Sequence, residues 1–217
     1  MLKTAAVAFA TFFATIGPVD VAAMFAALTS GATTQQRRHM ALKGSAIAAG
    51  ILLLFALAGE TILTHMGISL AALRTAGGIL LLLIGIDMVF ARSSGLVSTT
   101  PDESAEARLK ADISVFPLAT PLIAGPGAMG AAILLVADAE GDFVRQVVVT
   151  GTMLGVVALT FVLLLAASQV QKLLGVTGLH VITRVFGVLL CALAVQFMFD
   201  GIANSGLIDG SAMMDGG

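Results

Sequence analysis

Residues 113–136 read ISVFPLATPLIAGPGAMGAAILLV, a stretch of membrane-spanning length that carries Pro117, Pro121 and Pro126 inside an apolar run. Proline removes a backbone donor and clashes with the carbonyl one turn earlier, so a helix must kink or unwind there. A second break, Gly17-Pro18, interrupts the apolar run 4–28 at the corresponding place in the first half of the chain. Paired breaks of this kind are typical of the central site of a transporter.

The composition places this 217-residue chain in a lipid bilayer. Hydrophobic residues make up 58% and charged residues 11%, whereas soluble domains average about 45–50% and about 25%. Such a chain cannot cover itself with a polar surface, so the bilayer is its predicted surrounding. The formal net charge of −2 argues against a nucleic-acid partner.

Spanning helices need about 20 mostly apolar residues. Six segments meet this requirement: 4–29, 42–65, 69–91, 113–138, 143–169 and 179–201. We therefore predict an all-α integral membrane protein. Its expected parts are a first three-helix repeat at 1–92, a cytoplasmic linker at 93–112, a second three-helix repeat at 113–203 and a flexible C-terminal tail at 204–217.

The two halves also resemble each other away from the prolines. The matching residues are Gly67, Arg74 and Gly77 in the third segment and Gly175, Arg184 and Gly187 in the sixth. Each half holds an odd number of spans, so the second copy must enter the membrane from the opposite face. The pattern predicts a 3+3 inverted-topology repeat whose first and fourth helices are broken at the Gly/Pro sites.

Basic residues are distributed unequally between the two sides of the predicted bundle. One side carries Arg37, Arg38, Lys43, Arg92, Arg108, Lys110, Lys172 and Arg184, and the other carries only Lys3, Arg74 and Arg145. Cytoplasmic loops hold the excess of positive charge. Both termini are therefore predicted to lie on the non-cytoplasmic side.

The breaks predict a binding site because backbone groups left unpaired in hydrocarbon must be buried by protein or reached by water. A half-helix that begins near Val19 or Ala128 presents amides suited to a carboxylate, and the carbonyls before each break suit a cation. The alternative is that the prolines only kink helices for packing. The candidate substrate-binding residues are Thr15, Gly17, Pro18, Asp20, Thr120, Pro121, Gly125, Pro126 and Gly127.

Asp20 is the first acidic residue to consider, because it lies just past a break in an apolar segment, where ionisable groups mark ion or proton pathways. It is a candidate proton carrier or, alternatively, an N-cap of its own helix. Asp87 is expected to pair with Arg92 or to serve a pathway, and Glu60 and Asp200 to be solvated near helix ends. Gln196 is a further polar candidate inside the bundle.

Gly151 and Gly155 form a small-xxx-small motif in the fifth segment. Such motifs let membrane helices approach one another closely. We predict that this one serves helix packing.

Two runs, 116–128 and 67–81, resemble the MarC family of multi-spanning inner-membrane proteins, and the similarity covers residues 5–202. The resemblance implies a bacterial-type inner (plasma) membrane and the transport of neutral amino acids such as glycine and alanine. The family pattern at the first break is Asn or Asp, then Pro, a hydrophobic residue and Gly. This chain instead has Gly17-Pro18-Val19-Asp20.

The sequence lacks HExxH, GxSxG and GxxxxGK[ST] motifs, so no enzymatic activity is predicted. We expect a secondary transporter of a small zwitterionic solute, a neutral amino acid, that works by alternating access around a mid-membrane site. No cofactor is expected, and H+ or Na+ is the candidate coupling ion. A passive channel and a membrane scaffold without transport activity are the alternatives, and a homo-oligomer is left open.

Overall fold

The computed structural model describes residues 1–29, 31–90, 112–139 and 141–205. Among these residues, the regular elements are all helices. In chain order they are α1 (Leu2–Ile16), α2 (Pro18–Leu28), α3 (Thr34–His65), α4 (Leu70–Phe90), the π-helix η1 (Ser114–Ile123), α6 (Pro126–Ala137), α7 (Phe143–Leu165) and α8 (Ala167–Ala203). The predicted all-α class is confirmed. Most of the predicted linker and tail lies outside the described residues, so the domain boundaries stay predictions.

Several of these helices are long and apolar enough to cross a membrane. Within the described part of the chain, five segments qualify: Leu2–Leu28, Thr34–Gly59, Leu70–Phe90, Phe143–Leu165 and Thr183–Ala203. A sixth arises if η1 and α6, which are bent by 53° relative to each other, cross as one unit. The multi-span architecture follows from this composition, with five to six spans.

The second span begins earlier than its predicted start at residue 42. Thr33 is the N-cap of α3, and its Oγ1 accepts a hydrogen bond from the Gln36 amide at 3.3 Å. The Thr33 amide in turn donates to Gln36 Oε1 at 2.8 Å. This capping box pairs backbone amides that would otherwise lack partners. Hydropathy missed the start because the first turns of α3 are polar.

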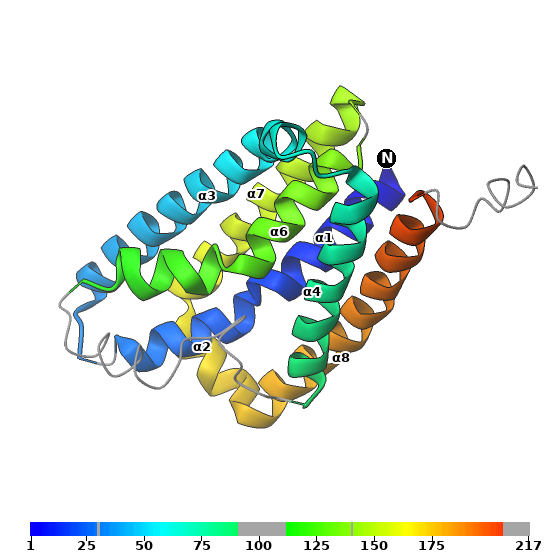
Figure 1. Ribbon diagram of the computed structural model, residues 1–217. Helices are drawn as coiled ribbons and strands as arrows, with labels where there is room; N and C mark the ends of the chain where they lie inside the picture. Colours follow the sequence, from blue (N-terminus) through cyan, green and yellow to red (C-terminus); the bar gives the residue numbers. More distant parts are fainter. Residues whose placement is uncertain (30, 91–111, 140, 206–217) are drawn as a thin grey trace, which may run out of the picture.

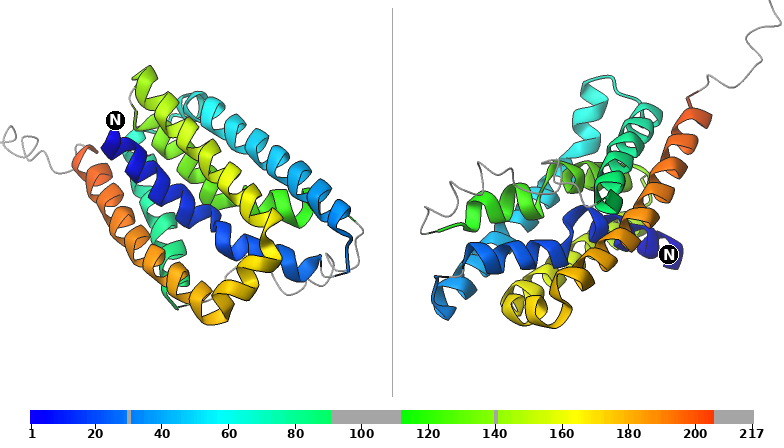
Figure 2. Two further views of the ribbon diagram at one scale, coloured as in Figure 1. Left: turned by 180° about the vertical axis from the view of Figure 1, so that it is seen from behind. Right: turned by 90° about the horizontal axis from the view of Figure 1, so that it is seen from below.

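The helices form two groups. α1, α3, α6 and α7 lie side by side, while α4 and α8 run antiparallel along one edge (Figure 1). The view from behind shows the same grouping (Figure 2). The interior holds large side chains that are fully buried, among them Phe12, Phe25, Leu52, Leu118 and Leu134. Large apolar residues such as Leu57 and Val162 are exposed on the outside, as a lipid-facing surface requires.

Glycines bring the backbones of α4 and α8 into contact, and these two helices share the most extensive interface between any two elements. A Cβ added to Gly78 would lie 2.7 Å from the carbonyl oxygen of Ala194, and one added to Gly85 would lie 3.0 Å from that of Gly187. Small residues allow this approach, and van der Waals packing then stabilises the helix pair.

Gly151 and Gly155 of α7 are different. A Cβ added to either glycine would meet nothing within 4 Å, and both residues are exposed. Between the described helices of this chain, the prediction that their motif packs two helices is therefore wrong.

Asp112 joins the start of η1 to α3. Its Oδ1 accepts hydrogen bonds from the amide and the hydroxyl of Ser114, and its Oδ2 lies 2.7 Å from Lys43 Nζ. The bonds from Lys43 and from Ser114 hold the pKa of Asp112 well below its usual range. Because the folded-state pKa lies below the unfolded value, this contribution to stability is present above the unfolded pKa. It is lost as the pH falls through the folded-state pKa.

Replacing Asp112 with asparagine should lower stability by less than about 1 kcal/mol, because exposed ion pairs contribute little and the Lys43 and Asp112 side chains are 41% and 47% exposed. The difference in melting midpoint between wild type and variant, followed by circular dichroism in detergent, should stay constant from about pH 8 to about pH 5. It should shrink only in stronger acid. A difference that disappears near neutral pH would contradict this assignment.

Candidate functional site

The first half of the candidate site is the interruption at Gly17. α1 ends at Ile16, Gly17 adopts the left-handed conformation with φ 60° and ψ 57°, and α2 begins at Pro18. The Gly17 amide still donates to Phe13 O at 3.0 Å, and the Val21 amide donates to Gly17 O at 2.9 Å. Glycine suits this conformation because it has no Cβ. Proline suits the first position of a helix because an N–H there has no partner within the helix.

The second half is the segment from η1 into α6. Phe116 and Thr120 have extended backbone angles inside η1, and Gly125 is the N-cap of α6, with φ −80° and ψ 168°. Pro126 occupies the start of α6, as Pro18 does in α2. The two Gly-Pro pairs therefore perform the same local task. Each lets the chain re-enter a helix after an interruption.

The two interruptions meet through Thr15 and Gly127. A Cβ added to Gly127 would lie 3.9 Å from Thr15 Cβ and would overlap Ile84 Cδ1 of α4. Thr15 is 3% exposed, and its hydroxyl donates to Thr11 O at 2.8 Å. The junction, where the sequence predicted a mid-membrane binding site, is thus tightly packed and closed.

Asp20 lies in the first turn of α2 but does not cap it. The N-cap is Gly17, and the helix has no side-chain cap, so the N-cap interpretation of Asp20 is wrong. Its carboxylate oxygens accept from Thr183 Oγ1 of α8 at 3.0 and 3.1 Å. These two residues line a space of about 10 Å³ together with Gly17 and Phe186, which is the room of about one water molecule.

The sequence did not single out Thr183. It lies next to Arg184, one of the residues that mark the repeat. A polar residue at this position could have been proposed as a partner for an acid in an apolar segment.

The remaining predicted residues are spread over the bundle. Thr120 and Pro121 are half-buried in η1, which packs against α3 and α2. Asp200 accepts from Gln196 Nε2 at 2.8 Å within α8. Asp87 is half-buried, whereas its predicted partner Arg92 and the side chain of Glu60 lie outside the described residues.

A further polar contact that sequence reasoning missed joins α4 to the end of α6. Arg74 is 9% exposed, and its guanidinium lies 2.6 Å from Asp138 Oδ1. The signal was present in the sequence, since an arginine inside an apolar segment usually pairs with an acid or faces a water-filled space.

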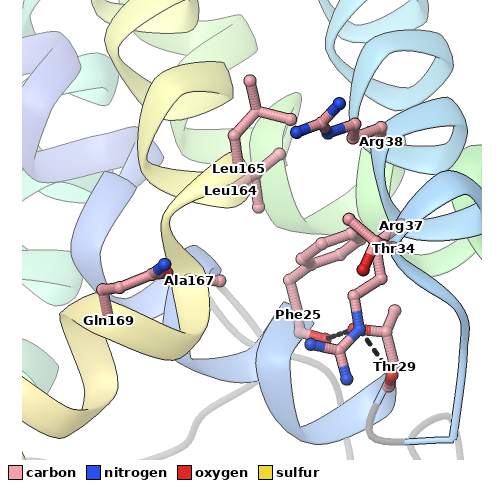
Figure 3. Close-up of a pocket in the computed structure, with 9 residues that line it drawn as sticks. All are labelled: Phe25, Thr29, Thr34, Arg37, Arg38, Leu164, Leu165, Ala167 and Gln169. Carbon is pink, nitrogen blue, oxygen red and sulfur yellow. Dashed lines mark hydrogen bonds between the residues drawn. The ribbon is translucent and has the colours of Figure 1, made fainter.

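Pockets open at opposite ends of the bundle. One, of about 460 Å³, lies between the start of α1 and the α6–α7 turn and is lined by Lys3, Asp138, Asp142 and Arg145. The other, of about 310 Å³, lies between the end of α2, the start of α3 and the end of α7. Arg37 and Arg38 are among the residues that line it (Figure 3). The structure thus gathers Lys3, Arg74 and Arg145 at one end, as the sequence predicted, with Arg37 and Arg38 at the other.

These features define a multi-pass α-helical integral membrane protein. The chain belongs to the MarC family, because the model of the MarC family integral membrane proteins matches residues 2–205. It is 38% identical to a UPF0056 membrane protein of Methanocaldococcus jannaschii over 91% of this chain and 95% of that protein. It is 35% identical to the UPF0056 membrane protein YvbG of Bacillus subtilis over 89% and 92%. No solved structure matches.

Proposed function

We propose that this protein is a secondary transporter that moves a small zwitterionic solute, a neutral amino acid, by alternating access. The observation that carries the proposal is the meeting of two helix interruptions, each followed by a proline at the start of a helix, through Thr15 and Gly127. Helix packing alone does not require two interruptions of the main chain to lie next to each other inside an apolar bundle.

The chemistry of the two helix starts suits a carboxylate and an ammonium group. The first-turn amides of α2 and α6 have no carbonyl partner within their own helices, and the positive end of each helix dipole lies there. A solute carboxylate would bind at these amides. Its ammonium group would bind the carbonyls one helical turn before Pro18 and Pro126, because proline has no N–H to donate to them.

The arrangement of the elements supports an inverted repeat. In Figure 1, α1 and α2 run from the labelled N-terminus at the upper right to the lower left, and η1 and α6 run back the other way. Two halves that enter the membrane from opposite faces are what alternating access around one central site requires.

The closed junction fits an occluded conformation in this mechanism. Solute could bind only if Ile84 separated from Gly127, opening a path toward one of the two end pockets at a time. We further propose that the basic end, with Arg37 and Arg38, faces the cytoplasm of a bacterial-type inner membrane. Protease accessibility of tags fused to the two termini, both expected outside, tests this orientation.

The experiment that tests the proposal is counterflow of labelled glycine or alanine in proteoliposomes that hold the purified chain. A carrier exchanges label and saturates, whereas current without saturation would identify a channel. If neither exchange of label nor current is observed, the protein is a scaffold without transport activity and the proposal is rejected. Thr15→Val keeps the shape of the side chain but removes its hydroxyl, so it should insert normally and exchange more slowly if the junction binds solute.

Asp20 supplies a prediction about coupling. If H+ is the coupling ion, replacement of Asp20 with asparagine should reduce proton-driven accumulation of solute about tenfold or more, because the side chain can no longer exchange a proton. Thr183→Val is the matched control, since it removes the hydrogen-bond donor and leaves the carboxylate in place. Accumulation by Asp20→Asn at the wild-type level, or driven by Na+ alone, would reject the proton-carrier role.

A further inference from the structure

The two end pockets differ in the charge of the side chains that line them. The Lys3 end combines basic residues with Asp138 and Asp142. The Arg37 end has two guanidinium groups, the hydroxyls of Thr29 and Thr34, and the amide of Gln169, and none of the described residues that line it is acidic. Of these two linings, as far as the structure describes them, the one at the Arg37 end favours an anion, whereas the other also contains carboxylates.

The two arginines are arranged differently in this pocket (Figure 3). Arg37 Nε donates to the carbonyl oxygen of Thr29 at 2.9 Å, which fixes its guanidinium beside the end of α2. Arg38 is exposed and forms no hydrogen bond or ion pair with another described residue. One group is therefore held in position, and the other can turn toward a ligand. Arginine binds phosphate through paired N–H donors.

The place of the pocket in the fold indicates where the anion comes from. Its far wall is formed by Leu164 and Leu165, the last residues of a membrane span, and Leu165 is 47% exposed. The arginines lie in the first turns of α3, whose span packs against α7. This combination of cations and exposed apolar surface at a span end matches the depth at which a bilayer has its headgroups.

From this geometry we infer that the pocket binds the phosphate headgroup of one anionic phospholipid, with an acyl chain along Leu165. A basic pocket between membrane helices is suited to such a headgroup. A free phosphate would use the arginines but would gain nothing from the apolar wall. The inference does not depend on the solute that the protein transports.

The test is native mass spectrometry of the delipidated full chain titrated with phosphatidylglycerol or phosphatidylcholine. We expect one phosphatidylglycerol to bind about tenfold or more tightly than phosphatidylcholine, and this preference to be lost in Arg37→Gln/Arg38→Gln. Arg38→Gln alone should weaken the preference without affecting folding, because Arg38 is exposed and forms no hydrogen bond or ion pair with another described residue. Lys3→Gln/Arg145→Gln, at the other pocket, should keep it.

Three outcomes would overturn the inference. The first is equal affinity for the two lipids, and the second is an unchanged preference in both arginine variants. The third uses inorganic phosphate in a thermal-shift assay: if phosphate raises the melting midpoint as much as short-chain phosphatidylglycerol does, the site takes a free anion and not a lipid.

Discussion

Replacement of Gly78 with leucine is expected to separate α4 from α8 and to lower stability by about 3 kcal/mol or more, the upper range for overpacking. A Cβ at this position would lie 2.7 Å from the carbonyl oxygen of Ala194 and 3.0 Å from the amide nitrogen of Met198. Both are backbone atoms of α8, so no rotation of a side chain can make room. The whole helix must move, and the most extensive interface in the bundle is lost with it.

Cys191 provides the readout, because it is the only cysteine of the chain and its Sγ would lie 2.6 Å from a Cβ on Gly85 in the same interface. A thiol-reactive dye should label it at a much lower temperature in Gly78→Leu than in the wild type. The matched control is Gly151→Leu, which adds the same side chain to a helical glycine whose added Cβ would have no described atom within 4 Å. Equal labelling midpoints for Gly78→Leu and the wild type would show that the helices do not touch here.

Replacement of Asp138 with alanine is the second change with a large expected effect. Arg74 is the buried member of the pair, with a side chain 11% exposed against 40% for Asp138. The variant removes the carboxylate that lies 2.6 Å from the Arg74 guanidinium. Breaking a buried pair from one side costs about 3–5 kcal/mol, and the partial exposure of Asp138 places the expected loss near the lower end of that range.

A double replacement separates the effect of the pair from that of its surroundings. Arg74→Met/Asp138→Leu replaces both charges with apolar side chains, and it should recover most of the stability lost in Asp138→Ala, because the buried guanidinium is then removed together with its carboxylate. The melting midpoints of the single and double variants in detergent provide the measurement. If the double variant is as unstable as the single one, the loss comes from packing and not from an uncompensated charge.

Several features of this protein could be predicted from its sequence because they depend on local chemistry. Pro18 and Pro126 were expected to interrupt helices, and both stand at helix starts, because a missing N–H and a fixed φ act on the nearest residues whatever the rest of the fold does. The grouping of Lys3 and Arg145 at one end of the bundle was also predictable. It follows from counting spans, since each crossing exchanges one side for the other.

Local chemistry could not predict the features that depend on which helices face each other. Gly78 and Gly151 are both glycines in apolar helices, yet a Cβ added to Gly78 would meet a backbone carbonyl, whereas one added to Gly151 would meet no described atom within 4 Å. Thr183 and Asp138 became relevant only when folding placed them against Asp20 and Arg74. In a chain this apolar, every helix face resembles every other, so the sequence carries little information about which faces pack.

The sequence by itself determined that the chain is an all-helical membrane protein and that Pro18 and Pro126 stand at helix starts, because these properties follow from the hydropathy and backbone chemistry of neighbouring residues. Only the tertiary structure decided that the two interruptions meet at Thr15 and Gly127. It also decided that Ile84 packs against Gly127 and closes this junction. The physical reason is that close packing in a bilayer depends on the complementary shapes of segments far apart in the chain.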